Sequence, residues 1–350
     1  MTTLAVGTEK GGWLLRSDDR VDWDVEGPFF PGWKVTAFGR AEDGTYLAGT
    51  ASGWFGPAVH RSADLESWEQ VTAGPGFGDS GPRLEQIWTF ANAPGGRLFC
   101  GVAEAGLFTS DDHGVTWTPV EAFNGHPTRH AWQPGAGGMC AHRVLFAGDR
   151  VWVAASAIGV FRSDDGGATF TPRNTGVDTV LPCDEPGIGY CVHALVADPA
   201  DPDTIWRQDH MGVYRTVDGG DCWERVERGL PAGFGFPIVR DDASGALFVF
   251  PLHAEHRLPI GGRFAAWRST DGGDSWSRSG KGWPAEPTYT GVLRGACATD
   301  GDGGVYFGST GGQVWATIDG GGTWQVLPGC YPRILALALW DCPAAGRTSG

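Results

Sequence analysis

Short runs of alternating apolar and polar residues recur along the whole chain in groups of three. In one group the runs span residues 143–146, 151–154 and 159–162, and a further run begins at Phe170. Alternation over a few residues predicts half-buried β-strands rather than helices. The same order of runs recurs between residues 192 and 226. Each group therefore predicts a four-stranded antiparallel meander.

An eight-residue pattern separates the third run from the fourth. Its clearest copy runs from Ser110 to Trp117 and reads Ser-x-Asp-x-Gly-x-Thr-Trp. Further copies span residues 163–170, 216–223, 269–276 and 317–324, and two shorter copies without the glycine span 17–23 and 62–68. The closing aromatic residues are Trp23, Trp68, Trp117, Phe170, Trp223, Trp276 and Trp324, at spacings of 45, 49, 53, 53, 53 and 48 residues. A period in this range indicates a repeat architecture.

The pattern has the chemistry of a hairpin turn. Ser and Asp side chains form hydrogen bonds with nearby backbone groups, and Gly takes the positive φ that a tight turn needs. The closing aromatic side chain then supplies a large apolar face for packing. The pattern resembles the Asp-box, or BNR, repeat of sialidases, sortilin-type receptors and bacterial propeller proteins often labelled sialidase or glycosyl hydrolase. The resemblance covers nearly the whole chain and implies a β-propeller in which the box is structural.

The two ends of the chain predict how such a propeller closes. The first turn is preceded by only two strand-like runs, which begin with residues 4–8, and one run, 334–340, is left over after the last turn. We expect this last run to pair with the first. The prediction is an all-β, seven-bladed propeller in a single domain of residues 1–350, with its first blade closed by the C-terminal strand. Such closure removes exposed sheet edges.

Composition agrees with this fold and limits the partners. The chain has 57 Gly and 17 Trp, which suits many turns and aromatic packing between sheets. The formal net charge is -15, and many of the acidic residues lie in the repeated turns. This charge argues against a nucleic-acid partner.

No apolar run has membrane-spanning length and the sequence begins without a signal peptide, so we expect a cytoplasmic protein with no membrane partner. The eight cysteines include no Cys-x-x-Cys motif, and we expect most of them to be free thiols. A disulfide between Cys183 and Cys191 is the less favoured alternative. The sequence leaves the oligomeric state open.

Antiparallel strand order sorts the connections onto two faces. The repeated turns and other short connections share one face, and the long segments 72–86, 121–140, 174–191 and 251–263 share the other. Functional residues concentrate on long loops held by a rigid scaffold. We therefore expect the functional site on the long-loop face, at the mouth of the central channel.

Three histidines predict a metal site at this mouth. His142 and His193 open equivalent inner strands of adjacent blades, and His210 lies one hairpin away from His193. Neutral imidazoles bind Zn, Cu, Fe or Ni, and three protein ligands with one open position are typical of catalytic zinc. We expect a divalent transition metal, namely Zn, Cu, Fe, Mn or Ni. In the alternative, each histidine donates to a loop carbonyl and fixes a turn.

Other chargeable and aromatic residues on this face predict substrate contacts. Glu255 is the candidate general base or fourth metal ligand, although a solvated pair with Arg257 is an equal alternative. Arginine forks suit carboxylate or phosphate groups. Arg294 and Arg333 open inner strands, so we expect both to point inward. The predicted substrate-binding residues are Arg129, Trp132, Arg257, Tyr289 and Arg294.

Three functions remain possible from the sequence. The first is an enzyme acting on a small polar, anionic metabolite at the channel mouth through a His-bound divalent metal, by hydrolase, lyase or isomerase chemistry. The second is a metal-free glycoside hydrolase using Glu255 with another carboxylate such as Glu104 or Asp209. The third is a non-catalytic assembly scaffold. Sialidase activity is not expected, because the Arg-Ile-Pro opening of the box-bearing sialidases is absent.

Overall fold

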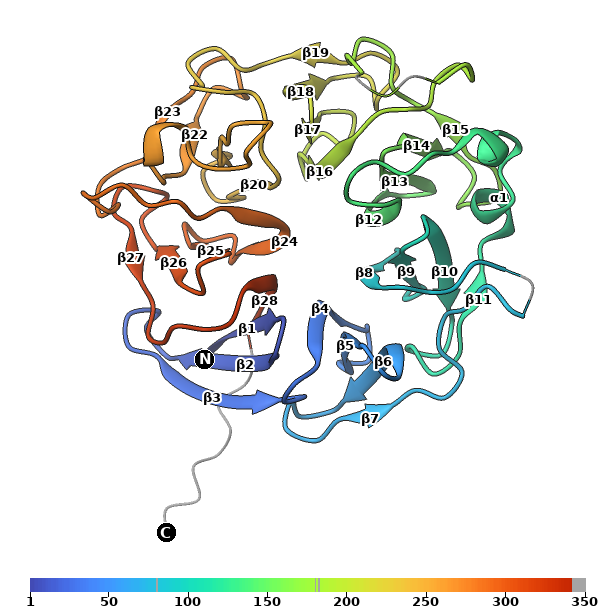
Figure 1. The fold of residues 1–350 in the computed structure, drawn as a ribbon, viewed down its shortest axis with the longest axis horizontal. Coiled ribbons are helices and arrows are strands. Elements are labelled where there is room, and N and C mark those ends of the chain that lie inside the picture. Colours follow the sequence, from blue (N-terminus) through green and yellow to red (C-terminus); the bar gives the residue numbers. More distant parts are fainter. Residues whose placement is uncertain (80, 180, 182, 342–350) are drawn as a thin grey trace.

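The computed structural model describes residues 1–79, 81–179, 181 and 183–341. Its sheets are arranged in a ring with their inner strands around the centre, and the largest sheet contributes two such strands (Figure 1). The chain is all-β with the arrangement of a β-propeller, as predicted. Within the described residues, no helix is long and apolar enough to cross a membrane.

Five sheets have four antiparallel strands each. In chain order they are β4 (Lys34–Arg40), β5 (Tyr46–Ser52), β6 (Gly56–Ser62) and β7 (Glu69–Gln70); β8 (Ile87–Asn92), β9 (Leu98–Val102), β10 (Gly106–Ser110) and β11 (Thr118–Pro119); β12 (Cys140–Ala147), β13 (Arg150–Ser156), β14 (Gly159–Ser163) and β15 (Thr171–Pro172); β16 (Val192–Ala197), β17 (Ile205–Asp209), β18 (Val213–Thr216) and β19 (Glu224–Arg225); and β20 (Ile238–Arg240), β21 (Leu247–Val249), β22 (Trp267–Ser269) and β23 (Ser277–Arg278). Each sheet is the meander that the alternating pattern predicts.

The remaining eight strands form one sheet in which two meanders meet. They are β24 (Val292–Thr299), β25 (Val305–Ser309), β26 (Val314–Thr317) and β27 (Gln325–Val326), and β28 (Ile334–Asp341), β1 (Thr2–Thr8), β2 (Gly11–Ser17) and β3 (Asp24–Phe29). The two meanders are joined by a single parallel pair, Gly295 with Ala336. Strand β28 runs antiparallel to β1 with Thr2 opposite Asp341, so the predicted pairing of the two chain ends is present.

Among the residues that the structure describes, three short helices lie in the long loops. They are α1 (Glu121–Asn124), η1 (Pro127–Ala131) and η2 (Ile260–Gly262). The first two fall in the segment 121–140, where the sequence predicted an irregular loop. Phe123 of α1 is fully buried, so this segment packs against the neighbouring sheets.

Each repeated turn is held by its own polar side chains. In the turn that follows β14, Ser163 Oγ donates to Asp165 Oδ1 at 2.7 Å, and Asp165 also accepts from the backbone N–H and the hydroxyl of Thr169. These bonds lower the pKa of Asp165 to about 2. Gly166 and Gly167 take φ values of 69° and 95°, which favour glycine. The turn chemistry expected from the sequence is therefore present.

The turns also connect neighbouring sheets. Trp152 of β13 donates its indole N–H to the carbonyl oxygen of Gly219 at 2.8 Å, and Trp206 of β17 donates likewise to Gly272 at 2.7 Å. Each carbonyl belongs to the repeated turn of the next sheet along the chain. Both tryptophans are buried, so these bonds are made in the cores between sheets.

Several inner strands carry a β-bulge near their first residues. The pairing shifts at Thr36 of β4, at His142 of β12 and at His193 of β16. A bulge adds one unpaired residue and turns its side chain in a new direction. All three side chains donate to a carbonyl in or just before the inner strand of the next sheet: Thr36 to Ile87 at 2.8 Å, His142 to Val192 at 3.0 Å and His193 to Gly235 at 2.6 Å. The bulges therefore fasten adjacent sheets around the channel.

Candidate functional site

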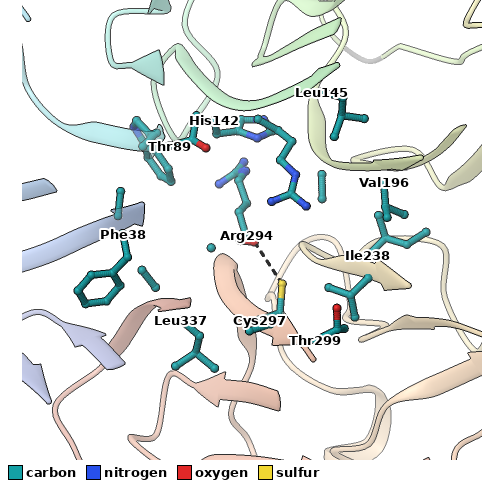
Figure 2. A pocket seen from close by; sticks show the side chains of 18 of the residues that line it. Phe38, Thr89, His142, Leu145, Val196, Ile238, Arg294, Cys297, Thr299 and Leu337 are labelled. Carbon is teal, nitrogen blue, oxygen red and sulfur yellow. Dashed lines mark hydrogen bonds between the residues drawn. The ribbon is translucent and has the colours of Figure 1, made fainter. Parts of the chain in front are cut away.

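Two cavities lie along the central channel, and Arg294 lines both. The bore cavity, of about 510 Å³, is lined by inner-strand residues such as Leu145, Val196 and Leu337 and reaches the short turns at Asp242 (Figure 2). The mouth cavity, of about 470 Å³, is lined by long-loop residues, among them Gly135, Leu181 and Leu252. The long-loop face thus contains a cavity of the size that small ligands occupy.

Three arginines face the mouth cavity. Arg257 follows β21 in a long loop, Arg294 comes from β24, and Arg333 immediately precedes β28. Arg257 and Arg333 are exposed at the rim, whereas Arg294 is half-buried. No Asp or Glu is found among the described residues that line this cavity, and none of the three arginines forms a described ion pair. The cavity therefore concentrates positive charge in a protein whose net charge is -15.

Arg294 lies at the junction of the two cavities. Its Nη2 donates to Ser156 Oγ at 3.3 Å, while its buried Nε atom has no hydrogen-bond partner. The guanidinium lies 5.0 Å from the ring centre of Phe236 and 5.9 Å from that of Trp88. Arg257 lies 6.0 Å from the Phe236 ring, on which both cations therefore pack. These contacts fix Arg294 but leave part of its hydrogen-bonding capacity unused.

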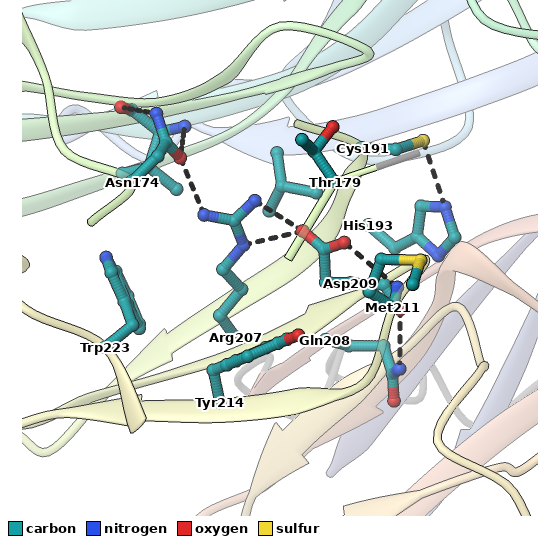
Figure 3. Close-up of polar contacts among 12 residues, drawn as sticks. Asn174, Thr179, Cys191, His193, Arg207, Gln208, Asp209, Met211, Tyr214 and Trp223 are labelled. Atoms are coloured by element: carbon teal, nitrogen blue, oxygen red, sulfur yellow. Dashed lines mark hydrogen bonds and ion pairs between the residues drawn. The ribbon is translucent and has the colours of Figure 1, made fainter. Parts of the chain in front are cut away.

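A cluster of one cysteine and two histidines also lines the mouth cavity. The candidate ligand atoms of Cys191, His193 and His210 lie within 4.8 Å of one another. The Sγ of Cys191 is 3.4 Å from His193 Nε2 (Figure 3). The backbone N–H of His210 donates to the carbonyl oxygen of Cys191 at 2.9 Å, which holds the hairpin loop of His210 beside Cys191.

The environment of His193 fixes its protonation. Because a carbonyl oxygen only accepts, the contact with Gly235 requires the proton on Nδ1, and Nε2 is left as an acceptor that faces Cys191. Burial, together with the positive charge of Arg294, lowers the pKa of His193 well below its usual value. Burial also lowers the pKa of His210. Both imidazoles are therefore neutral at pH 7.

His142 lies in the other cavity. It lines the bore cavity and is absent from the lining of the mouth cavity (Figure 2). Its Nε2 donates to Val192, and burial with the charge of Arg294 lowers its pKa to about 3. The structure therefore groups His193 and His210 with Cys191, and the expected grouping with His142 is not formed. The reason is that His142 and His193 occupy equivalent bulges but donate through opposite ring nitrogens.

Glu255, the predicted base, projects into solvent. Its side chain is 78% exposed and lies 3.8 Å from His256, in an exposed group that also includes His253. Arg257, two residues further along, lines the mouth cavity, whereas Glu255 does not. The alternative of a solvated acid fits this position better, although its neighbour is His256 rather than Arg257.

Three predicted substrate contacts lie outside the mouth cavity. Arg129 donates to the backbone carbonyls of Glu104 and Ala105, and it stacks on Trp132, which is buried in the core beside Phe123. Tyr289 is 63% exposed and is not part of the cavity lining. Arg129 and Trp132 thus anchor the segment 121–140 against its sheet. Of the five predicted substrate residues, the structure brings Arg257 and Arg294 together.

A buried ion pair lies in β17, the strand that leads into the loop of His210. The guanidinium of Arg207 in β17 bonds to the carboxylate of Asp209 and to Asn174 Oδ1, and both charged side chains are inaccessible to solvent (Figure 3). Asp209 also accepts from the backbone N–H of Met211 at 3.1 Å. The loop that presents His210 is therefore fixed at both of its sides, and Asp209 is fully engaged in this network.

Cys191 is the member of the cluster that the sequence reasoning missed. It is a free thiol, as is Cys183, so the alternative disulfide is not formed, while Cys342 lies outside the described residues. The signal was its spacing: Cys191 stands two residues before His193, as Cys140 does before His142. Cys191 is partly accessible and Cys140 is buried.

Comparisons with known proteins support the fold. No protein-family model matches the sequence, and no curated protein is significantly similar to it. A solved ancestral GH74 enzyme matches 80% of this chain with a TM-score of 0.53 and 17% identity, and this chain covers 36% of that enzyme. YCF48 from Cyanidioschyzon merolae matches 85% of this chain and 88% of its own, with a TM-score of 0.53 and 15% identity. Likenesses at such identity bear on the fold alone, which is that of a β-propeller.

Proposed function

We propose that this protein is an enzyme that acts on a small anionic molecule held in the mouth cavity. The observation that carries the proposal is the convergence of Arg257, Arg294 and Arg333 on a cavity whose described lining contains no carboxylate. Guanidinium groups bind carboxylates and phosphates through paired hydrogen bonds. The unpartnered Nε of Arg294 is a buried donor that such an anion would satisfy.

The reaction would take place beside the arginines. Cys191, His193 and His210 line the same cavity, so an anion bound by the arginines lies next to a thiol and two neutral imidazoles. A divalent transition metal at this cluster would supply Lewis-acid chemistry, of the hydrolase, lyase or isomerase class. The arginines would orient the substrate, and the aromatic rings of Trp88 and Phe236 would exclude water from one side.

Anion binding is the first test. Titration calorimetry with inorganic phosphate, a hydroxy acid, a dicarboxylate and a sugar phosphate should show binding to the purified chain. Arg294→Met, which retains an apolar stem of similar length, should weaken that binding by at least about tenfold, since one charged hydrogen-bonding partner is worth about 1.5–3 kcal/mol. Incubation of the bound compound with the protein, followed by NMR, then reveals turnover.

The matched control is Arg263→Met. Arg263 is exposed on the same face, immediately after η2, and it does not line the mouth cavity. Its replacement should leave binding unchanged. The proposal fails if no anion in the panel binds, or if Arg294→Met and Arg263→Met bind equally well.

The cavity lining bears on the glycoside hydrolase alternative, and the exposed apolar surface bears on the scaffold alternative. A metal-free glycoside hydrolase needs a pair of carboxylates about 5–10 Å apart across the bond that it cleaves, and the described lining of the mouth cavity contains no carboxylate. An assembly scaffold would use exposed apolar surface. Trp54 is 92% exposed and Phe55 81% exposed, on the loop between β5 and β6, and these residues are where a scaffold partner would be sought.

We also propose that the fold is a seven-bladed propeller built on Asp-box turns. The support is that the eight-stranded sheet divides into two meanders joined at one residue pair, which together with the five other sheets gives seven units. The Ser and Asp hydrogen bonds recur in the turns that begin at Ser17, Ser62, Ser110, Ser163, Thr216, Ser269 and Thr317.

A further inference from the structure

The geometry points to a zinc-type metal site formed by the Cys191 thiolate and the imidazoles of His193 and His210, with its open position facing the mouth cavity. The inference deepens the proposed function, because it names the atoms that would act on the anion held by the arginines. It also replaces His142 with Cys191 in the ligand set.

The spacing of the ligand atoms fits such a centre. With Zn–S of about 2.3 Å and Zn–N of about 2.0–2.1 Å in a tetrahedron, sulfur and nitrogen lie about 3.6 Å apart. The observed separation of Cys191 Sγ and His193 Nε2 is 3.4 Å. The His210 ligand atom lies within 4.8 Å of both, and its ring is half-buried.

His193 is already prepared as a ligand. Metal-binding histidines commonly donate their second ring N–H to a carbonyl, which fixes the tautomer and the ring orientation. His193 does so through Nδ1 to Gly235 at 2.6 Å, and its Nε2 lone pair faces Cys191. His142 has the opposite arrangement, since Nε2 is the nitrogen that donates. The site is assigned to His193 because His193 lines the mouth cavity with Cys191 and His210, whereas His142 lines the bore cavity.

The backbone also holds the other two ligands together. Cys191 and His210 are joined by the hydrogen bond from His210 N–H to the Cys191 carbonyl. Asp209, the residue before His210, is fixed by Arg207 and by Met211 N–H. A site whose ligands are ordered before the metal arrives loses less conformational entropy on binding.

The charges of the cavity are compatible with a cation once the thiol ionises. Binding releases the Cys191 proton to solvent, so the sulfur contributes one negative charge to the metal. Arg294 and Arg257 repel a cation in the empty cavity, and a bound anionic substrate offsets this repulsion. Thiolate with imidazole suits zinc better than the oxygen-seeking magnesium or calcium. The site therefore combines a metal and arginines around one anion-binding space.

The test measures metal directly. Protein prepared without a metal-affinity tag and treated with a chelator is dialysed against zinc or cobalt, and bound metal is counted by elemental analysis. We expect about one metal per chain and, for cobalt, a thiolate-to-metal charge-transfer band. Cys191→Ser and His210→Gln should each lower the affinity at least tenfold and remove or shift this band. His142→Ala is the matched control, because it loses an equivalent bulge histidine yet should keep the metal.

His193→Ala removes a contact between sheets as well as a ligand, so its folding is checked by circular dichroism. If that variant is unfolded, Cys191→Ser and His210→Gln still test the ligand set.

Wild-type protein that takes up neither metal overturns the site, and rapid alkylation of Cys191 in that protein would identify a thiol–imidazole pair instead. Equal metal loss in His142→Ala and Cys191→Ser also overturns the ligand set. Phosphate binding to the chelated protein is measured separately, so failure of the metal site and failure of the anion pocket are told apart.

Discussion

At the scale of single residues, the repeated turns show how one carboxylate organises a hairpin. Asp112, Asp165 and Asp271 each accept hydrogen bonds from the Thr or Ser four residues later and from a Ser hydroxyl two residues earlier. These hydrogen bonds form only in the folded chain. The same local bonding therefore makes the turns specific and couples them to pH.

At this scale we predict that the folded protein loses stability in acid. Hydrogen bonds lower the pKa of Asp112, Asp165 and Asp271 to about 2, from an ordinary value of 3.8. A lowered folded-state pKa gives stabilisation that is complete above about pH 4 and is lost as the pH falls towards 2. The urea midpoint should therefore decrease over this window. Asp165→Asn should lower the midpoint at pH 7 and flatten its decrease, whereas Asp164→Asn, which lies outside the turn bonds, should leave the slope unchanged.

At the scale of elements, the sheets are fastened to one another by side chains that reach the next sheet. The indole of Trp152 in β13 bonds to the turn after β18. The bulge residues Thr36 and His142 bond to the next inner strand, and His193 bonds to Gly235, just before the next inner strand. Because a bulge residue is unpaired in its own strand, its side chain is free to make this contact. These positions therefore carry both stability and the walls of the channel.

Trp152→Phe tests these contacts between sheets. The substitution removes the indole N–H, after which the carbonyl of Gly219 accepts from the guanidinium of Arg162 alone, at 3.0 Å. The expected loss is about 0.5–1.5 kcal/mol in the free energy of unfolding, the net worth of one hydrogen bond, measured by urea titration. Trp54→Phe is the control, and as an exposed substitution it should change the free energy by less than about 0.5 kcal/mol. Equal effects of the two substitutions would show that the bond between sheets contributes nothing.

At the scale of the whole molecule, the two chain ends close the ring. Strand β28 pairs along its length with β1 and touches β24 through Gly295 and Ala336. Without β28, the inner edge of β1 and the channel beside β24 would be exposed. The channel cavities also depend on this closure, because Ala336 and Leu337 line the bore cavity and Arg333 lines the mouth cavity.

At this scale we predict that closure requires strand β28 but does not require β28 to come last in the chain. A chain ending before Ile334 should lose cooperative thermal unfolding, because β1 then lacks its inner partner. A circular permutant that joins the original ends through a short flexible linker and begins at Pro332 should unfold cooperatively, since β28 then leads into β1 as the first hairpin. The closure model is wrong if the truncated chain melts like the full chain, or if the permutant also fails to fold while its linker is long enough.

The sequence by itself determined the repeat, the turns, the pairing of residues 334–340 with the first strand, and the gathering of the long loops on one face. These features follow from local chemistry: two-residue alternation, the Ser and Asp bonds of each turn, and the antiparallel order of strands. It also placed Arg257, Arg294, His193 and His210 on the long-loop face, where they line the mouth cavity, since their loops and strand ends are identifiable from that order.

Only the tertiary structure decided which side chains meet. His142 and His193 have the same position in the repeat, but they line different cavities. His142 donates to the next strand through Nε2, whereas His193 donates to Gly235 through Nδ1. Trp132 is drawn into the core by Phe123 and Phe161, and Glu255 stays in solvent because its loop folds back through the bond from Arg257 N–H to His253. Cys191 enters the cluster through the approach of the His210 loop. Ring orientation and loop approach depend on contacts between sheets, which repeat position does not encode.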